Sequence, residues 1–92
     1  MRMTDRIRGK IAAALDPERI EVVDESHLHI GHAGARPEGE THFRVTVVAP
    51  SFAGLSRMER QRRIYAILAE EMRERIHALS LTTLTPQEAE RT

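Results

Sequence analysis

The hydrophobic and polar residues near the start of the chain alternate with the period of an amphipathic helix. The apolar side chains recur every three or four residues, at Met3, Ile7, Ile11, Ala14 and Leu15. This pattern predicts a helix over residues 4–15, with Thr4 as its N-cap. Asp16 and Pro17 should end the helix, because the residue before a proline is pushed out of the α region.

Two stretches with a period of two residues follow, and they predict β-strands over residues 19–26 and 41–49. Residues 27–40 between them hold three glycines and Pro37, so they predict a loop. Hairpin loops usually have about 2–5 residues, and this loop is much longer. Loops of such length in compact domains are usually functional or disordered, so this one is a candidate for function.

The second half of the chain predicts a turn over residues 51–55, a long helix and a last strand. Ser56 should cap the helix together with Glu59, and the helix should run to about Arg75. Its expected core stripe, which Ile64 widens, is Met58, Gln61, Tyr65, Leu68, Met72 and Ile76. Residues 77–85 alternate as a strand that Pro86 ends, and residues 87–92 are expected to be a frayed tail.

The predicted order of elements is α-β-β-α-β, which indicates an α+β fold. The first two strands should form an antiparallel hairpin, and the helical crossover should make the second and third strands parallel. We therefore expect a three-stranded mixed sheet with the helices on one face. The chain of 92 residues should form one domain over residues 1–92, with a folded core over residues 3–86. This order resembles the αββααβ topology of class II KH-like domains.

Composition narrows the possible functions. Lys+Arg and Asp+Glu are equal at 14 each, and only 3% of the residues are aromatic, which disfavours nucleic-acid binding by global charge or by base stacking. No apolar run is long enough to span a membrane, and no export signal is evident. We expect a cytoplasmic protein, although an organellar protein without its presequence would look the same. No catalytic constellation appears, so an enzyme is not expected.

The five histidines are the best candidates for metal ligands, because the chain has no cysteine. His27, His29 and His32 lie in the long loop, where they are either solvated or bind metal, and His27 and His29 could together form a weak zinc or copper site. His42 is interpreted as a structural strand residue that faces opposite to Phe43. His77 opens the last strand, where a packed or capped role is the alternative to ligation. Without cysteine the chain cannot hold an iron–sulfur cluster alone, but two imidazoles can serve one iron, as in Rieske centres.

Several motifs in this order resemble the BolA-like family. They are VVDES and HFRV around the loop, F-x-G-x-S from Phe52, R-x-R-x-I-Y over residues 60–65, and His77-Ala78-Leu79. The motifs extend over residues 22–84. The family often has histidine where this chain has Gln61, and the loop here is of a longer type.

The resemblance implies a partner of monothiol glutaredoxins in iron–sulfur cluster trafficking or iron homeostasis. In such complexes a 2Fe–2S cluster is shared, with thiolates from glutaredoxin and glutathione, and the chain alone holds none. The implied ligands of this chain are His77 and His29, with His32 as the alternative to His29. The protein without a partner is expected to be a monomer or a weak dimer.

Some members of the family are described as transcription regulators that bind DNA through the KH-like face, and this is the alternative function. Its candidate residues are Arg57, Arg60, Arg62 and Arg63 in the long helix. Glutamates follow late in the same helix, which is the reverse of the order that a helix dipole favours. The string Gly31-His32-Ala33-Gly34 matches a KH clamp, but it lies between strands and not between helices, so we reject it.

Overall fold

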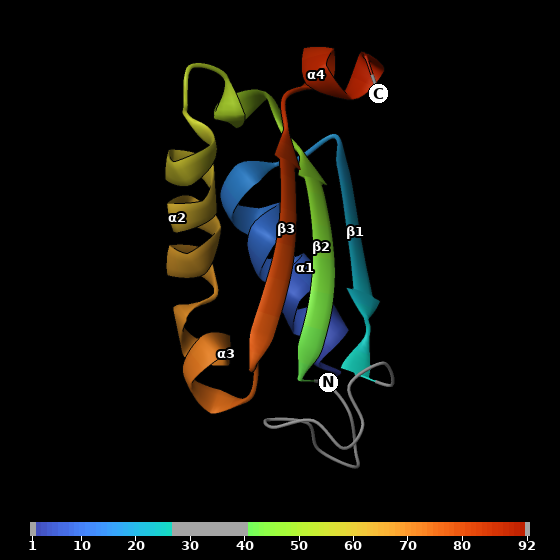
Figure 1. The fold of residues 1–92 in the computed structure, drawn as a ribbon, viewed down its shortest axis with the longest axis vertical. Helices are drawn as coiled ribbons and strands as arrows, with labels where there is room; N and C mark the ends of the chain where they lie inside the picture. Colours follow the sequence, from blue (N-terminus) through green and yellow to red (C-terminus); the bar gives the residue numbers. More distant parts are fainter. Residues whose placement is uncertain (1, 27–40, 92) are drawn as a thin grey trace.

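The computed structural model describes residues 2–26 and 41–91. The strands form one three-stranded sheet. Figure 1 shows helices behind this sheet and beside it. The elements in order are α1 (Met3–Leu15), β1 (Arg19–Asp24), β2 (His42–Val48), the 3-10 turn η2 (Pro50–Phe52), α2 (Arg57–Ile67), α3 (Ala69–Glu74), β3 (Ala78–Leu84) and α4 (Pro86–Glu90).

β2 is the central strand of the sheet, whose order is β1-β2-β3. β1 pairs with it in antiparallel fashion, from Arg19 opposite Val48 to Asp24 opposite Phe43. β3 pairs with it in parallel, from His42 beside Ala78 to Val48 beside Leu84. The predicted α+β fold with a mixed sheet is therefore confirmed.

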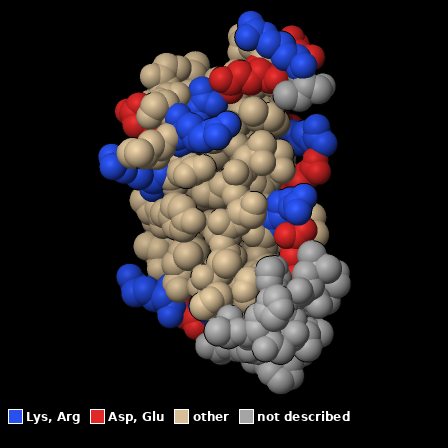
Figure 2. Space-filling view, viewed as in Figure 1, with Lys and Arg blue, Asp and Glu red and all other residues tan. Residues whose placement is uncertain are grey.

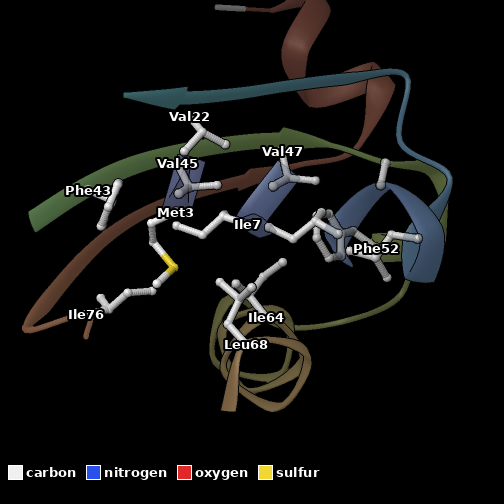
Figure 3. Close-up of a cluster of buried hydrophobic side chains, with 13 residues drawn as sticks. Met3, Ile7, Val22, Phe43, Val45, Val47, Phe52, Ile64, Leu68 and Ile76 are labelled. Carbon is white, nitrogen blue, oxygen red and sulfur yellow. The ribbon is translucent and has the colours of Figure 1, made fainter. Parts of the chain in front are cut away.

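The hydrophobic core lies between one face of the sheet and the helices α1 and α2 (Figure 3). β2 contributes Phe43, Val45 and Val47, which alternate along the strand as the sequence pattern predicts. Helix α1 contributes the apolar stripe predicted by its period, and α2 contributes a different stripe from the predicted one. The fully buried side chains that the helical segments add to this core are Ile7 and Ile11 of α1, Ile64 of α2, and Leu68 between α2 and α3. No helix among the described residues is long and apolar enough to cross a membrane.

The sequence predicted the C-terminal end of α1 correctly, but not its N-terminal end. Asp16 adopts the left-handed conformation, with φ of 46°, so the helix stops before Pro17 as expected. The start was predicted wrongly, because α1 begins at Met3 and no side chain caps it. Met3 packs into the core at 4% exposure, and this burial extends the helix past Thr4.

The predicted long helix is two helices, α2 and α3, which meet at Leu68. The helical segment ends near Arg75 as expected, but it has an earlier break at Leu68 that was not predicted. Ser56 and Glu59 form the predicted capping box at the start of α2. The break at Leu68 puts Glu70 and Glu71 in the first turn of α3, where they interact favourably with the dipole of that helix. In one continuous helix these glutamates would lie near the C-terminal end, where the helix dipole disfavours them, and the break avoids this arrangement.

The buried stripe of α2 differs from the predicted one. Met58 is 62% exposed and Tyr65 is 40% exposed, so their assignment to the core was wrong. Ile64 faces the sheet instead, and one turn before it lies the buried Arg60. The sequence pattern misled because an arginine occupies a core position, which hydrophobic periodicity cannot detect.

The C-terminal segment forms a helix over residues 86–90, so the expected frayed tail was wrong there. Thr85 and Glu88 form a capping box at the start of α4. Arg60 of α2 donates to both carboxylate oxygens of Glu88, at 2.6 and 3.3 Å, and to the carbonyl oxygen of Thr83 at 3.1 Å. These bonds tie α4 to α2 and to the end of β3.

We predict opposite effects for alanine at two glycines. Gly9 lies inside α1, and apart from the backbone of its own helix no atom lies within 4 Å of the position that a β-carbon would take there, so Gly9→Ala should stabilise the protein by about 0.5–1 kcal/mol. Gly54 has φ of 83°, so Gly54→Ala should destabilise it by about 1–2 kcal/mol. Urea unfolding of both variants measures these effects, and a less stable Gly9→Ala variant would contradict the first.

We also predict that the Arg60–Glu88 ion pair makes stability sensitive to acid. The hydrogen bonds from Arg60 lower the pKa of Glu88 from 4.5 to about 2. A lowered pKa means that the stabilisation is present above about pH 4.5 and is lost as the pH falls towards 2. Glu88→Gln should therefore be less stable than the wild type at pH 7, and the difference should shrink over this range.

Urea unfolding at a series of pH values measures this difference. The matched control is Glu90→Gln, because Glu90 is exposed on the same helix and makes no ion pair with another described residue. An equal loss of stability in the two variants at pH 7 would show that the Arg60–Glu88 pair is not responsible.

Candidate functional site

His77 lies between α3 and β3 and is exposed. Its backbone N–H donates to the carbonyl oxygen of Thr41 at 2.7 Å, and the N–H of Ala78 donates to the same oxygen at 3.2 Å. The backbone at His77 is thus held against the start of β2, while the residue stays accessible to a partner.

His42 lies directly beside His77. The two ring centroids are 5.2 Å apart and the ring planes are tilted by 50°. The register explains this contact, because His42 pairs with Ala78 in the parallel β2–β3 ladder. The interpretation of His42 as a strand residue is confirmed. Its contact with His77 was not predicted, although the expected parallel pairing of these strands was the signal that could have shown it.

The predicted loop ligands His29 and His32 lie outside the described residues, as do His27 and the Gly31–Gly34 string. The two ends of their loop are described. Ser26 and Thr41 are both buried, and the N–H of Thr41 donates to the hydroxyl oxygen of Ser26 at 2.9 Å. The loop therefore leaves and rejoins the sheet beside Thr41, the residue that also holds His77.

A hollow of about 270 Å³ adjoins His42 on the face of the sheet away from the core. Its lining residues are Glu25, His42, Phe43, Ala78, Leu79 and Ser80. Glu25 on its rim forms an ion pair with Arg44 at 3.2 Å. Figure 2 shows this face of the molecule, with mostly uncharged atoms over β2 and β3 and charged residues at the margins. The hollow and the open face give a partner access to the site.

The donor atoms of the described residues are too few for a complete metal site. Within residues 2–26 and 41–91, no group of three or more histidine, cysteine, aspartate or glutamate side chains can hold a metal ion. The chain has no cysteine at any position. Two imidazoles suit one iron of a cluster whose remaining ligands are thiolates. Histidines of this chain can therefore serve as imidazole ligands of an iron, whereas any thiolate ligand would have to come from another molecule.

The predicted arginine patch on α2 is smaller than expected. Arg57, Arg62 and Arg63 are exposed. The Arg60 side chain is only 11% exposed, and its guanidinium is bonded to Leu55, Thr83 and Glu88. Arg60 is therefore a structural residue, and its inclusion in a nucleic-acid surface is corrected. Sequence alone did not show this, because Glu88 is distant along the chain.

The sequence model of the family described as BolA-like protein matches residues 11–88 of this chain. The chain belongs to the BolA-like family. The regulator BolA of Escherichia coli K12, named a DNA-binding transcriptional regulator, is 43% identical over 98% of this chain and 82% of its own length. SufE-like protein 1 of Arabidopsis thaliana is 44% identical over 90% of this chain, which spans only 24% of that relative.

Solved structures of BolA domains have the same fold. The BolA domain of SufE1 from Arabidopsis thaliana superimposes with a TM-score of 0.84 at 42% identity, covering 92% of this chain and 93% of that one. BolA1 from Mus musculus gives a TM-score of 0.82 at 38% identity, covering 97% of this chain and 69% of that one. The names of the BolA-like relatives describe a regulator or BolA-like proteins and not enzymes.

Proposed function

We propose that this BolA-like chain is a non-catalytic adaptor that supplies histidine ligands to a 2Fe–2S cluster shared with a monothiol glutaredoxin and glutathione. Its role would be in iron–sulfur cluster trafficking or iron regulation. The observation that carries the proposal is the exposed His77, held by its backbone at the place where the histidine-rich loop joins the sheet. Because the loop that carries His27, His29 and His32 begins and ends here, we infer that one of its histidines joins His77 in binding the cluster.

The proposed ligands are His77 and a histidine of the loop, with His29 preferred to His32. His77 is the fixed member, because two backbone hydrogen bonds hold its segment to Thr41. The cluster, when bound, supplies iron that accepts imidazole nitrogen and thiolate sulfur. Neutral imidazoles leave such a site less negative than thiolates alone, and they must be deprotonated to bind. The missing thiolates would come from the partner and glutathione.

The proposed setting is a reducing compartment, with the cytoplasm as our prediction. The partner thiol and glutathione must stay reduced in order to serve as ligands, and such conditions are typical of the cytosol. In the absence of its partner we expect the chain to be a monomer or a weak dimer.

We predict that His77→Ala prevents formation of the shared cluster. The chain, a monothiol glutaredoxin and glutathione are mixed under conditions of cluster assembly, and visible absorption and circular dichroism are recorded. The wild-type mixture should give spectra that differ from those of glutaredoxin alone, and the His77→Ala mixture should not. His29→Ala and His32→Ala then identify the loop ligand, because only the variant that lacks the ligand should behave like His77→Ala.

The matched control is His27→Ala, which removes a loop histidine outside the proposed ligand set. It should leave the spectra of the mixture unchanged. Identical spectra for wild type and His77→Ala, with each protein folded, would show that His77 is not a ligand.

A DNA-binding regulator is the second candidate function. It is favoured by the name of the Escherichia coli relative and by the three exposed arginines of α2. The equal numbers of acidic and basic residues count against it, because they provide no global attraction to DNA.

We predict for this second function that duplex DNA binding weakens steeply with salt. The plot of log affinity against log salt has a negative slope. If Arg62 and Arg63 each contact a phosphate, replacing both with alanine should make this slope less steep by about 1.8. Replacing Arg2 and Arg8 of the N-terminal region is the control, and it should leave the slope unchanged. Weak binding with a flat salt dependence in the wild type would exclude the DNA-binding role.

A further inference from the structure

Thr41 makes several polar contacts at the site, and no sequence pattern indicated them. It is 0% exposed and is the residue immediately before β2. Its N–H donates to Ser26 Oγ at 2.9 Å, and its carbonyl oxygen accepts the N–H groups of His77 and Ala78. Its hydroxyl oxygen lies 2.8 Å from Nδ1 of His42. One residue thus connects the base of the loop, the backbone at His77 and the ring of His42.

The hydrogen bonds at Ser26 decide which way the Thr41 hydroxyl points. Ser26 Oγ accepts the N–H of Thr41 at 2.9 Å and the N–H of His42 at 3.2 Å. A hydroxyl oxygen has two acceptor lone pairs, so these two donors occupy both. The Thr41 hydroxyl lies 3.4 Å from the same oxygen, a long distance for a hydroxyl hydrogen bond. Its proton therefore belongs in the shorter contact, with Nδ1 of His42.

This direction determines the tautomer of His42. A ring nitrogen that accepts a hydrogen bond carries no proton, and in a neutral imidazole the other nitrogen then carries it. The Thr41 hydroxyl thus favours His42 with a lone pair on Nδ1 and a proton on Nε2. Among the contacts of residues 2–26 and 41–91, the opposite arrangement would leave only Ser26 Oγ for the Thr41 hydroxyl proton, as a third donor to that oxygen.

We propose that Thr41 is the positioning residue of the site, because its carbonyl holds the His77 backbone and its hydroxyl holds His42 as the Nε2–H tautomer. The part concerning His77 rests on the proposed function, and the part concerning His42 does not. Nδ1 of His42 is engaged by Thr41, and a nitrogen that binds metal must first lose its proton. In this tautomer neither ring nitrogen of His42 is ready to bind a metal, so His77 remains the proposed ligand of the pair.

Nitrogen-15 NMR of histidine in the chain alone, with neutral rings and without iron, tests the tautomer. The His42 signals are assigned by their loss in His42→Ala. In the wild type, Nε2 of His42 should resonate as a protonated nitrogen and Nδ1 as a nitrogen with a lone pair. Thr41→Val keeps the branched shape but removes the hydroxyl, so the ratio of Nε2–H to Nδ1–H should fall by a factor of about 3–10.

Two further variants separate the hydroxyl from the packing around it. Thr41→Ser keeps the hydroxyl and should keep the wild-type tautomer. Ser26→Ala removes the acceptor of two backbone N–H groups but leaves the Thr41 hydroxyl, so it should loosen the loop base with the Nε2–H tautomer retained. Amide exchange at His77 should remain slow in Thr41→Val, because the backbone carbonyl that accepts its N–H is unchanged.

The wild-type spectrum alone can overturn the proposal, even if Thr41→Val fails to fold. A predominant Nδ1–H tautomer would overturn it, and so would an unchanged ratio in a folded Thr41→Val. A failure of the glutaredoxin mixture to form a cluster would reject the proposed function but would leave these NMR results standing. Conversely, the Nδ1–H tautomer of His42 in the wild type would overturn the role of the Thr41 hydroxyl but would not contradict His77 as a cluster ligand.

Discussion

The parallel pairing of β2 with β3 is the constraint on which the site depends. It is the pairing that brings the end of α3, and His77 with it, to the start of the central strand. The carbonyl oxygen of Thr41 accepts the N–H groups of His77 and Ala78 at this point. A shift of the register by one residue would turn every alternating side chain of β3 to the other face, and it would separate His77 from His42. The core under the sheet therefore also maintains the site.

Ion pairs between distant segments complete this small domain. Arg60 holds α4 to α2, and the fully buried Glu71 is bonded to Arg6 at 2.8 Å and to Lys10 at 2.7 Å, which joins α3 to α1. These contacts lower the pKa of the Glu71 carboxyl although its burial acts in the opposite direction. Buried charges of this kind need their partners, because an unpaired one is costly. Because Arg6 and Arg60 are used in these internal ion pairs, fewer arginines remain available to an external ligand.

Three features of this BolA-like chain bear on the function that we propose. It has no cysteine, its described residues form no group of three or more metal-binding side chains, and its exposed His77 lies beside an open sheet face. In the proposed cluster sharing, the chain would contribute only part of the ligand set. The polar network of Ser26, Thr41 and His42 lies inside this edge, where it orients the residues that a partner would meet.

Local patterning was sufficient for the presence of the strands, for the presence and the end of α1 and for the cap of α2. Their signals, such as alternation in β2 and the Ser56–Glu59 capping box, depend on neighbours within a few residues. Helix α4 was missed although its Thr85–Glu88 capping box is a local signal, and the hydrophobic period gave no sign of the break at Leu68. The burial of Arg60 was missed because its partner Glu88 is far along the chain. The same holds for the site. Sequence singled out His77 as a candidate, but only the folded chain brings His42 and Thr41 beside it, because strand register joins segments that no local pattern relates.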